Sequence, residues 1–212
     1  MDNARRTSLW RRQAIGLASA LRHDARAMAA VEGAMLAPVA LLIFALLIYA
    51  AEGFAIDRKV SMTARTVTDL ITQTTPTQYS NGSSVMTEAA IDNLLQVASS
   101  VLAPYSASNM TMVVSQVQIG STGTTATVTW SEPYNGGTAR PAGQVLTLPG
   151  TIGTGQAGNY FIFGEVYYNY TQLNFYESLS PITLYGSIYL TPRQSTSITC
   201  SNCVTPWTAP SS

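Results

Sequence analysis

The chain has 212 residues, of which only 10% are charged, and its 11 basic and 11 acidic residues give a formal net charge of zero. This zero conceals an asymmetry, because residues 66–212 contain two arginines against six acidic residues. A region with so few cations lacks the basic stripe that a nucleic-acid partner requires, so we expect no nucleic-acid partner. Its polarity comes instead from Ser, Thr, Asn and Gln, which is common in extracytoplasmic and fibre-forming proteins.

The first predicted element is a membrane helix. Nineteen residues without a charge separate Glu32 from Glu52. At about 1.5 Å per residue, a helix of this length spans about 28 Å, close to the thickness of the hydrocarbon core of a bilayer. Six arginines precede the run and fewer cations follow it, so the positive-inside rule places the N-terminus in the cytoplasm and the remainder outside.

A cleavable secretory signal is the alternative interpretation of the apolar run. Signal peptides have a shorter apolar region, about 7–15 residues, and end at a small-x-small cleavage site. Here the run is longer, and cleavage after Ala51 or Ala50 would place Tyr49 or Ile48 at the third position back, where a small residue is required. A retained anchor is therefore favoured.

Two helices are predicted in all. The first runs from 28 to 74 with Pro38 inside it, and its part beyond the membrane carries one apolar face: Ile56, Val60, Ala64, Val67 and Ile71. The second runs from about 86 to 103, and Pro104 ends it. Its predicted buried face consists of Ile91, Leu94, Leu95, Ala98, Val101 and Leu102.

The rest of the chain is predicted to form strands. Met110–Ile119 and 124–131 flank the glycine-containing connection 120–123, which indicates a hairpin. A long glycine-rich loop with a short strand near 144–148 follows, and then two strands, Tyr160–Tyr170 and Ile182–Leu190. The first of these has apolar residues on both faces, which is typical of a central strand. The predicted fold class is α+β, with a helix packed on an antiparallel sheet and a long N-terminal helix before it.

Two cysteines, Cys200 and Cys203, lie near the C-terminus. Two thiols do not complete a structural zinc site, and the only histidine, His23, is predicted on the other side of the membrane. In an oxidising compartment the pair can close a small disulfide loop, and unpaired thiols are the alternative. The surrounding sequence has no thioredoxin-like pattern that would indicate a redox motif.

Several segments, taken in order, carry a resemblance to a known family. They are Ala29-Ala-Val-Glu-Gly-Ala-Met-Leu-Ala-Pro38, Ala64-Arg-Thr-Val-Thr-Asp-Leu-Ile-Thr-Gln73, Val114-Ser-Gln-Val-Gln-Ile119, Val128-Thr-Trp-Ser131 and Glu165-Val-Tyr-Tyr-Asn-Tyr170. This arrangement resembles the TadE-like pseudopilins, minor pilins of the tight-adherence (Flp-type) pilus system. The likeness covers roughly residues 25 to 192.

The resemblance implies cleavage by a prepilin peptidase between Ala27 and Met28, which makes Glu32 the fifth residue of the mature chain. The family's usual residue before the cut is glycine, and this chain has alanine there. A carboxylate at the start of a membrane helix is costly without a partner. The N-terminal amine of a neighbouring subunit would be such a partner for Glu32, and wetting at the headgroup level is the alternative.

An enzyme is not expected, and neither is a cofactor or metal. The predicted exported part has no histidine, and its carboxylates are scattered singly, except Glu88 and Asp92 at helical spacing. The predicted function is that of a minor pilin or pilus-assembly factor that acts through subunit contacts. A membrane-anchored ectodomain that binds carbohydrate or envelope components is the alternative.

The predicted partners are other pilins or pseudopilins, the pilus assembly platform, a prepilin peptidase and membrane lipid. The predicted location is a bacterial inner membrane, crossed once, with the C-terminal domain in the periplasm; the sequence leaves open whether the protein enters a surface pilus. The predicted regions are a basic leader (1–27), a transmembrane helix (28–52), a membrane-proximal amphipathic helix (53–76), a pilin-like exported α+β domain (77–192) and a flexible tail (193–212).

Overall fold

A computed structural model describes residues 25–73, 83–171, 182–200 and 202–206. The chain divides into two compact units, Met1–Ala51 and Glu52–Ser212, and the long helix α2 (Ala25–Gln73) contributes residues to both. The bounds of α2 agree closely with the predicted helix over 28–74.

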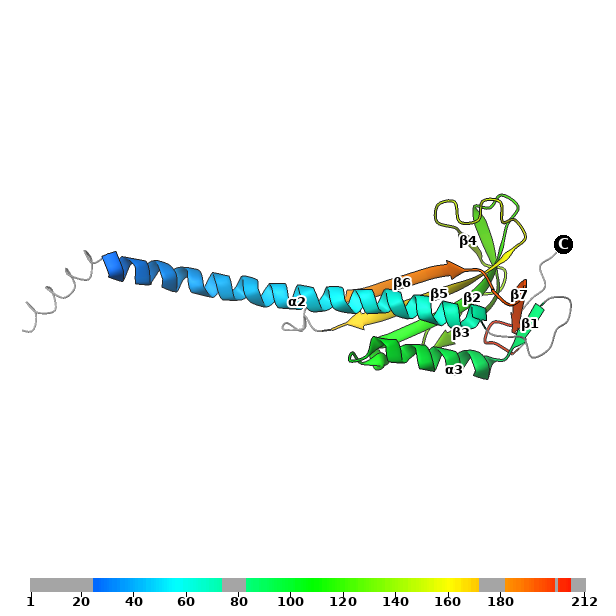
Figure 1. The fold of residues 1–212 in the computed structure, drawn as a ribbon, viewed down its shortest axis with the longest axis horizontal. Coiled ribbons are helices and arrows are strands. Elements are labelled where there is room, and N and C mark those ends of the chain that lie inside the picture. Colours follow the sequence, from blue (N-terminus) through cyan, green and yellow to red (C-terminus); the bar gives the residue numbers. More distant parts are fainter. Residues whose placement is uncertain (1–24, 74–82, 172–181, 201, 207–212) are drawn as a thin grey trace, which may run out of the picture. The chain divides into compact units, whose positions relative to one another are not determined.

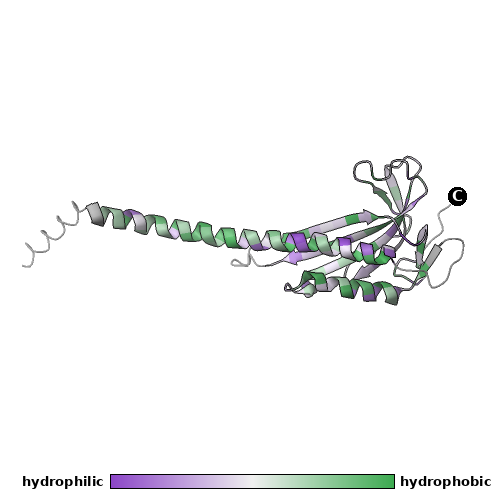
Figure 2. Cartoon of the chain, viewed as in Figure 1, coloured by the Kyte–Doolittle hydropathy of each residue, from purple (hydrophilic) through white to green (hydrophobic). Residues whose placement is uncertain are grey.

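Apolar, exposed side chains characterise α2 in the first unit. Every side chain from residue 28 to 48 is exposed, including Met35 at 73% and Leu41 at 68%. Green, the colour of hydrophobic residues, dominates this part of the helix in Figure 2. The helix is long and apolar enough to cross a membrane, a property shared by membrane anchors and signal sequences.

In the second unit, α2 buries one face. The predicted apolar face is confirmed, since each of its members is at most 1% exposed: Ile56, Val60, Ala64, Val67 and Ile71. Their spacing of three or four residues places them on one side of a helix with 3.6 residues per turn. They join the larger hydrophobic core together with residues from α3, β2, β3 and β5.

The main sheet has five antiparallel strands in the order β4-β3-β2-β5-β6. Its strands are β2 (Met110–Ile119), β3 (Thr125–Tyr134), β4 (Val145–Thr147), β5 (Tyr160–Tyr170) and β6 (Ile182–Leu190). The predicted hairpin is confirmed, because Gly120 N–H donates to Thr125 O at 2.8 Å where β2 turns into β3. The antiparallel α+β class is confirmed as well.

β3 extends three residues beyond its predicted end at 131. It includes Pro133, which lacks the N–H that a ladder uses. β4 pairs only with residues 125–127, so the end of β3 is free of that neighbour and tolerates a proline.

β5 is a central strand, as its two apolar faces predicted. It pairs with β2 on one side and β6 on the other. Ile162 and Val166 belong to the larger core under the helices, whereas Phe161 and Phe163 belong to a second cluster on the opposite face. Figure 1 shows α3 and the second part of α2 along the same face of this sheet.

Two glycines allow α2 to approach the sheet closely. A Cβ added to Gly164 in β5 would lie 2.0 Å from Thr68 Oγ1, and one added to Gly186 in β6 would lie 3.1 Å from Ser61 Cα. Since contacts under about 3 Å do not occur between such atoms, the helix occupies space that any side chain at Gly164 would need.

The short helix α3 (Glu88–Ser99) begins two residues later than predicted and continues as a 3₁₀ turn, Ser100–Leu102. Thr87 is its N-cap, since its Oγ1 accepts a hydrogen bond from Ala90 N–H. The predicted buried face is confirmed for Ile91, Leu95, Ala98 and Leu102, and Leu94 and Val101 are half-buried. Lys59 of α2 donates to the backbone oxygens of Val101 and Ala103, which favours the helix end electrostatically.

A second, two-stranded sheet was not predicted. β1 (Ser83–Met86) pairs in parallel with β7 (Ser197–Cys200). β7 lies within the predicted flexible tail, so the boundary at 193 is a correction: residues 197–200 form a strand, and Ile198 is buried in the larger core. Of the predicted tail, residues 201 and 207–212 lie outside the described residues.

Candidate functional site

The N-terminal residues singled out from the sequence lie in the first unit. The Ala27–Met28 bond is inside α2, which begins at Ala25, and the side chain of Ala27 lies outside the description. Glu32 is exposed and is the only charged residue between 28 and 51. Processing at this bond and a role of Glu32 in assembly stay predictions.

Cys200 and Cys203 form a disulfide with their Cα atoms 5.6 Å apart. Both residues are buried in the larger core. Between them, Asn202 Oδ1 accepts a hydrogen bond from Glu88 N–H at the start of α3, at 3.3 Å. Just after them, Val204 N–H donates to the Glu132 carboxylate at 2.7 Å. The hydrogen bonds fasten the C-terminal segment to the domain, and the disulfide closes a small loop within that segment.

A hollow among the described residues lies on the other face of the sheet. It is a cavity of about 460 Å³ with a floor formed by Thr111 and Val113 of β2 and Glu165 and Tyr167 of β5. Thr111 lies opposite Tyr167 and Val113 opposite Glu165 in the ladder. Their neighbours along the strands belong to the core under the helices, so these four side chains are on the face away from α2 and α3.

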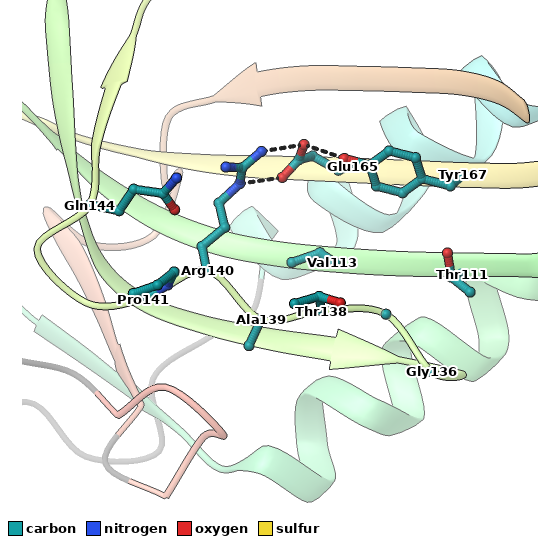
Figure 3. A pocket seen from close by; sticks show the side chains of 11 residues that line it. Thr111, Val113, Gly136, Thr138, Ala139, Arg140, Pro141, Gln144, Glu165 and Tyr167 are labelled. Carbon is teal, nitrogen blue, oxygen red and sulfur yellow. Dashed lines mark hydrogen bonds and ion pairs between the residues drawn. The ribbon is translucent and has the colours of Figure 1, made fainter.

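The loop between β3 and β4, residues 135–144, forms the opposite wall, as Figure 3 shows. Its ends are pinned to the sheet, because Gly137 N–H donates to Tyr134 O at 3.1 Å and Gly143 N–H donates to Val128 O at 2.8 Å. In its middle, Arg140 N–H donates to Ser131 Oγ at 3.0 Å. The loop therefore holds Arg140 above the sheet.

The turn into this loop depends on particular residues. Asn135 has a positive φ of 51°, and its side-chain amide donates to Met110 O at 2.7 Å. Gly136 follows with a φ of 79°, a conformation that favours glycine. A Cβ on Gly137 would lie 2.6 Å from Met112 O, so only glycine lets the loop pass this close to β2.

Arg140 and Glu165 form a bidentate ion pair in the cavity (Figure 3). Arg140 Nε lies 2.6 Å from Glu165 Oε2, and Arg140 Nη2 lies 2.7 Å from Oε1. The Glu165 side chain is 2% exposed and that of Arg140 is 23% exposed. A buried carboxylate requires such a partner, because leaving water costs it several kcal/mol.

Two phenols complete the hydrogen bonding of Glu165. Tyr167 and Tyr185 donate to Oε1 at 2.9 and 3.0 Å. Burial raises the pKa of both phenols, and the negative charge of Glu165 raises it further, so both remain protonated donors. The hydrogen bonds that Arg140 donates to Glu165 are the main cause that raises the pKa of Arg140.

Aromatic rings support the arginine. Its guanidinium carbon lies 5.4 Å from the centroid of the Phe163 ring, and that ring stacks on Tyr189 with centroids 4.1 Å apart. Burial also raises the pKa of Tyr189 to about 12. The rings of Phe163 and Tyr189 thus support the guanidinium, and the loop fixes the backbone of Arg140.

The charged groups of this cavity are bonded to one another. Four donors surround the Glu165 carboxylate, so both of its oxygens are engaged within the protein. Among the residues that the structure describes, no group of three His, Cys, Asp or Glu side chains is placed to hold a metal ion. The remaining polar groups on the walls include Thr111, Thr138 and Gln144.

Arg140 and Glu165 were not identified as a site from the sequence. The available signal was Glu165 itself, a carboxylate inside an otherwise apolar predicted central strand, which must be buried and therefore paired. Residues 66–212 have only two cations, Arg140 and Arg193, and Arg58, Lys59 and Arg65 of α2 also belong to the second unit, so few partners for Glu165 were possible. Arg193 instead pairs with Asp69.

Comparison with protein-family models, with curated proteins and with solved structures finds no match to this chain.

Proposed function

We propose that this protein is a minor pilin or pilus-assembly factor of the tight-adherence type, which acts through contacts with other subunits in the inner membrane and periplasm. The observation that supports this function best is the continuous helix α2. It exposes apolar side chains from residue 28 to 48 and then buries Ile56, Val60 and Val67 in the core of an antiparallel α+β domain.

A helix of this kind suits a subunit that is stored in a membrane and assembles laterally. Its exposed apolar stretch fits either lipid or the apolar helices of neighbouring subunits, whereas a soluble domain would bury such a surface. Glu32 is the only charge in that stretch. In an assembly the N-terminal amine of a neighbouring chain would neutralise it, and in this proposal its role is to guide that contact.

The experiment replaces Glu32 with leucine. The substitution extends the apolar segment, so Glu32→Leu should leave membrane insertion intact, measured by the fraction of protein in the inner membrane. Pili counted by electron microscopy and pilin co-purified with the protein should both fall strongly. Glu52→Gln, which removes a carboxylate at the other end of the apolar run, is the matched control and should retain pili. Wild-type piliation in Glu32→Leu would overturn the role given to this residue.

The alternative, an anchored domain that binds carbohydrate, has one observation in its favour, namely the polar cavity beside Arg140. Such binding is compatible with a minor pilin, because the cavity belongs to the second unit and α2 contributes no residue to its walls.

A further inference from the structure

We propose that the cavity between the loop after β3 and strands β2 and β5 is a binding site for a neutral saccharide unit. Its volume of about 460 Å³ lies within the range of roughly 300–1,000 Å³ that is typical of small-molecule sites. The proposal needs only the fold of the second unit, so it stands independently of any role in a pilus.

The charge of the cavity selects a neutral ligand. Arg140 is the one cation among the described residues that line it, and Glu165 neutralises it through two hydrogen bonds. An anion would have to be held against that adjacent carboxylate, which costs energy at these distances. A cationic ligand would be repelled by the guanidinium of Arg140. An uncharged ligand meets neither penalty.

The polar atoms of the cavity require a ligand that both donates and accepts hydrogen bonds. A guanidinium has five N–H donors, and Glu165 takes two of them. Gln144 Oε1 is a buried acceptor that has no hydrogen-bond partner among the described residues. That oxygen has almost no accessible surface of its own, so the acceptors for a ligand are the hydroxyls of Thr111 and Thr138 on the cavity wall.

Hydroxyl groups meet both requirements, because one oxygen donates and accepts at once. Thr111 and Thr138 add two protein hydroxyls to the walls, and the Tyr167 ring adds an apolar surface beside them. Adjacent hydroxyls on a sugar ring match this mixture of donors, acceptors and aromatic surface. A purely apolar ligand would leave the same groups unpaired.

The test is saturation-transfer NMR on the full chain in a zwitterionic detergent, since a glycoside detergent would itself present sugar headgroups. The probes are glucose, galactose, N-acetylglucosamine and disaccharides of each, at millimolar concentration. Inorganic phosphate and N-acetylglycine amide serve as an anionic and a neutral amide comparison. We expect at least one saccharide to give a transfer signal and a titratable affinity, and phosphate to give neither.

Gln144→Leu replaces a polar side chain of the cavity wall with an apolar one and should weaken saccharide binding about tenfold, the factor that corresponds to one net hydrogen bond. The melting temperature should not fall, because the lost oxygen has no hydrogen-bond partner among the described residues. Gln96→Leu, on the exposed side of α3, is the matched control and should bind as the wild type does. Thr111→Val, close in shape to threonine, provides a second variant should Gln144→Leu fail to fold, and it should also weaken binding.

The absence of signal from every saccharide would overturn the proposal. A signal from phosphate or the amide alone would overturn the class of ligand. Saccharide binding of wild-type strength in both Gln144→Leu and Thr111→Val would overturn the location. Loss of binding in these two variants, with retention in Gln96→Leu, would support all three parts.

Discussion

Two buried carboxylates of this protein have very different surroundings. Glu165 receives four hydrogen bonds, two of them from a guanidinium. Glu132, only 2% exposed, receives one from Val204 N–H and has Asp92 and Glu88 as charged neighbours. Burial, and to a lesser degree the repulsion from these two acids, raises the pKa of Glu132. Glu132 is therefore the carboxylate through which pH should influence stability.

We predict that Glu132→Gln stabilises the protein at neutral pH but not in acid. A raised native pKa means that the native state holds the proton more tightly than the unfolded chain does. The contribution of Glu132 to the free energy of unfolding is thus fully present below its unfolded pKa, near 4.5, and is lost as pH rises through the higher native pKa. Glutamine stays neutral and still accepts from Val204 N–H. Chemical denaturation at about pH 4 and about pH 7.5 should show a gain only at the higher pH.

The exposed Asp57→Asn serves as the control for this experiment, and it should change little at either pH. An equal gain from Glu132→Gln at both pH values would mean that the effect comes from packing rather than from the proton. A loss at neutral pH would show that the charged form is the better partner for Val204.

At the level of elements, the sequence predicts those whose pattern is long. The bounds of β2, β5 and β6 agree with the prediction, because nine or more residues of alternating or continuous apolar character separate a strand clearly from its surroundings. β1 and β7 have only four residues each, and most of the sequence of the domain lies between these two paired strands. Such short strands have no recognisable period, and only the folded chain brings them together.

The candidate site was less predictable than the fold for a related reason. Glu165 could be recognised as a carboxylate in need of a partner, but the loop that carries Arg140 has no repeating pattern from which a position over the sheet could be inferred. Its path depends on single contacts, such as the close approach of Gly137 to Met112 O. These contacts are properties of the tertiary structure.

The packing of α2 on the sheet provides a prediction at this scale. Gly164→Ala should lower the free energy of unfolding by about 1–3 kcal/mol, the usual cost of an overpacked core, since its Cβ would collide with Thr68 Oγ1. In a Thr68→Ala background the same substitution should cost much less, because the oxygen is gone and the nearest remaining side-chain atom, Thr68 Cβ, lies at 3.3 Å. Denaturant unfolding of the four chains measures this coupling.

Gly53→Ala is the control, since its Cβ would have only an ordinary contact, at 4.0 Å from Tyr170. As an alanine in a helix, it should stabilise by about 0.5–1 kcal/mol or have no effect. Purely additive effects of Gly164→Ala and Thr68→Ala would contradict the close approach of helix and sheet.

At the level of the whole molecule, the second unit should fold only with its part of α2. We predict that a chain beginning at Gly53 is soluble and unfolds cooperatively, whereas one beginning at Thr77 aggregates. The shorter chain loses Ile56, Val60, Val67 and Ile71, each fully buried. At about 1.5–3 kcal/mol for each side chain, the loss is as large as the total stability of an ordinary domain, about 5–15 kcal/mol.

Periplasmic expression of both chains, followed by size-exclusion chromatography and thermal unfolding, tests this. A monomeric, cooperatively melting chain from Thr77 would show that residues 53–73 of α2 are not needed for the folded domain. Aggregation of both chains would show that residues before Gly53 are also needed for a folded domain.

The parallel pairing of β1 with β7 sets an order of events during synthesis. β2 and β3 are neighbours along the chain and can pair as soon as their hairpin has left the ribosome. β1 precedes both, yet its partner follows β6, and the contact between Glu88 and Asn202 near this pair spans 114 positions. The first strand of the domain is therefore among the last to form its hydrogen bonds. Until then, its backbone N–H and C=O groups remain available to other chains. Translation that stalls before residue 197 would leave a product with a formed hairpin but an unpaired first strand, a natural target for quality-control proteases.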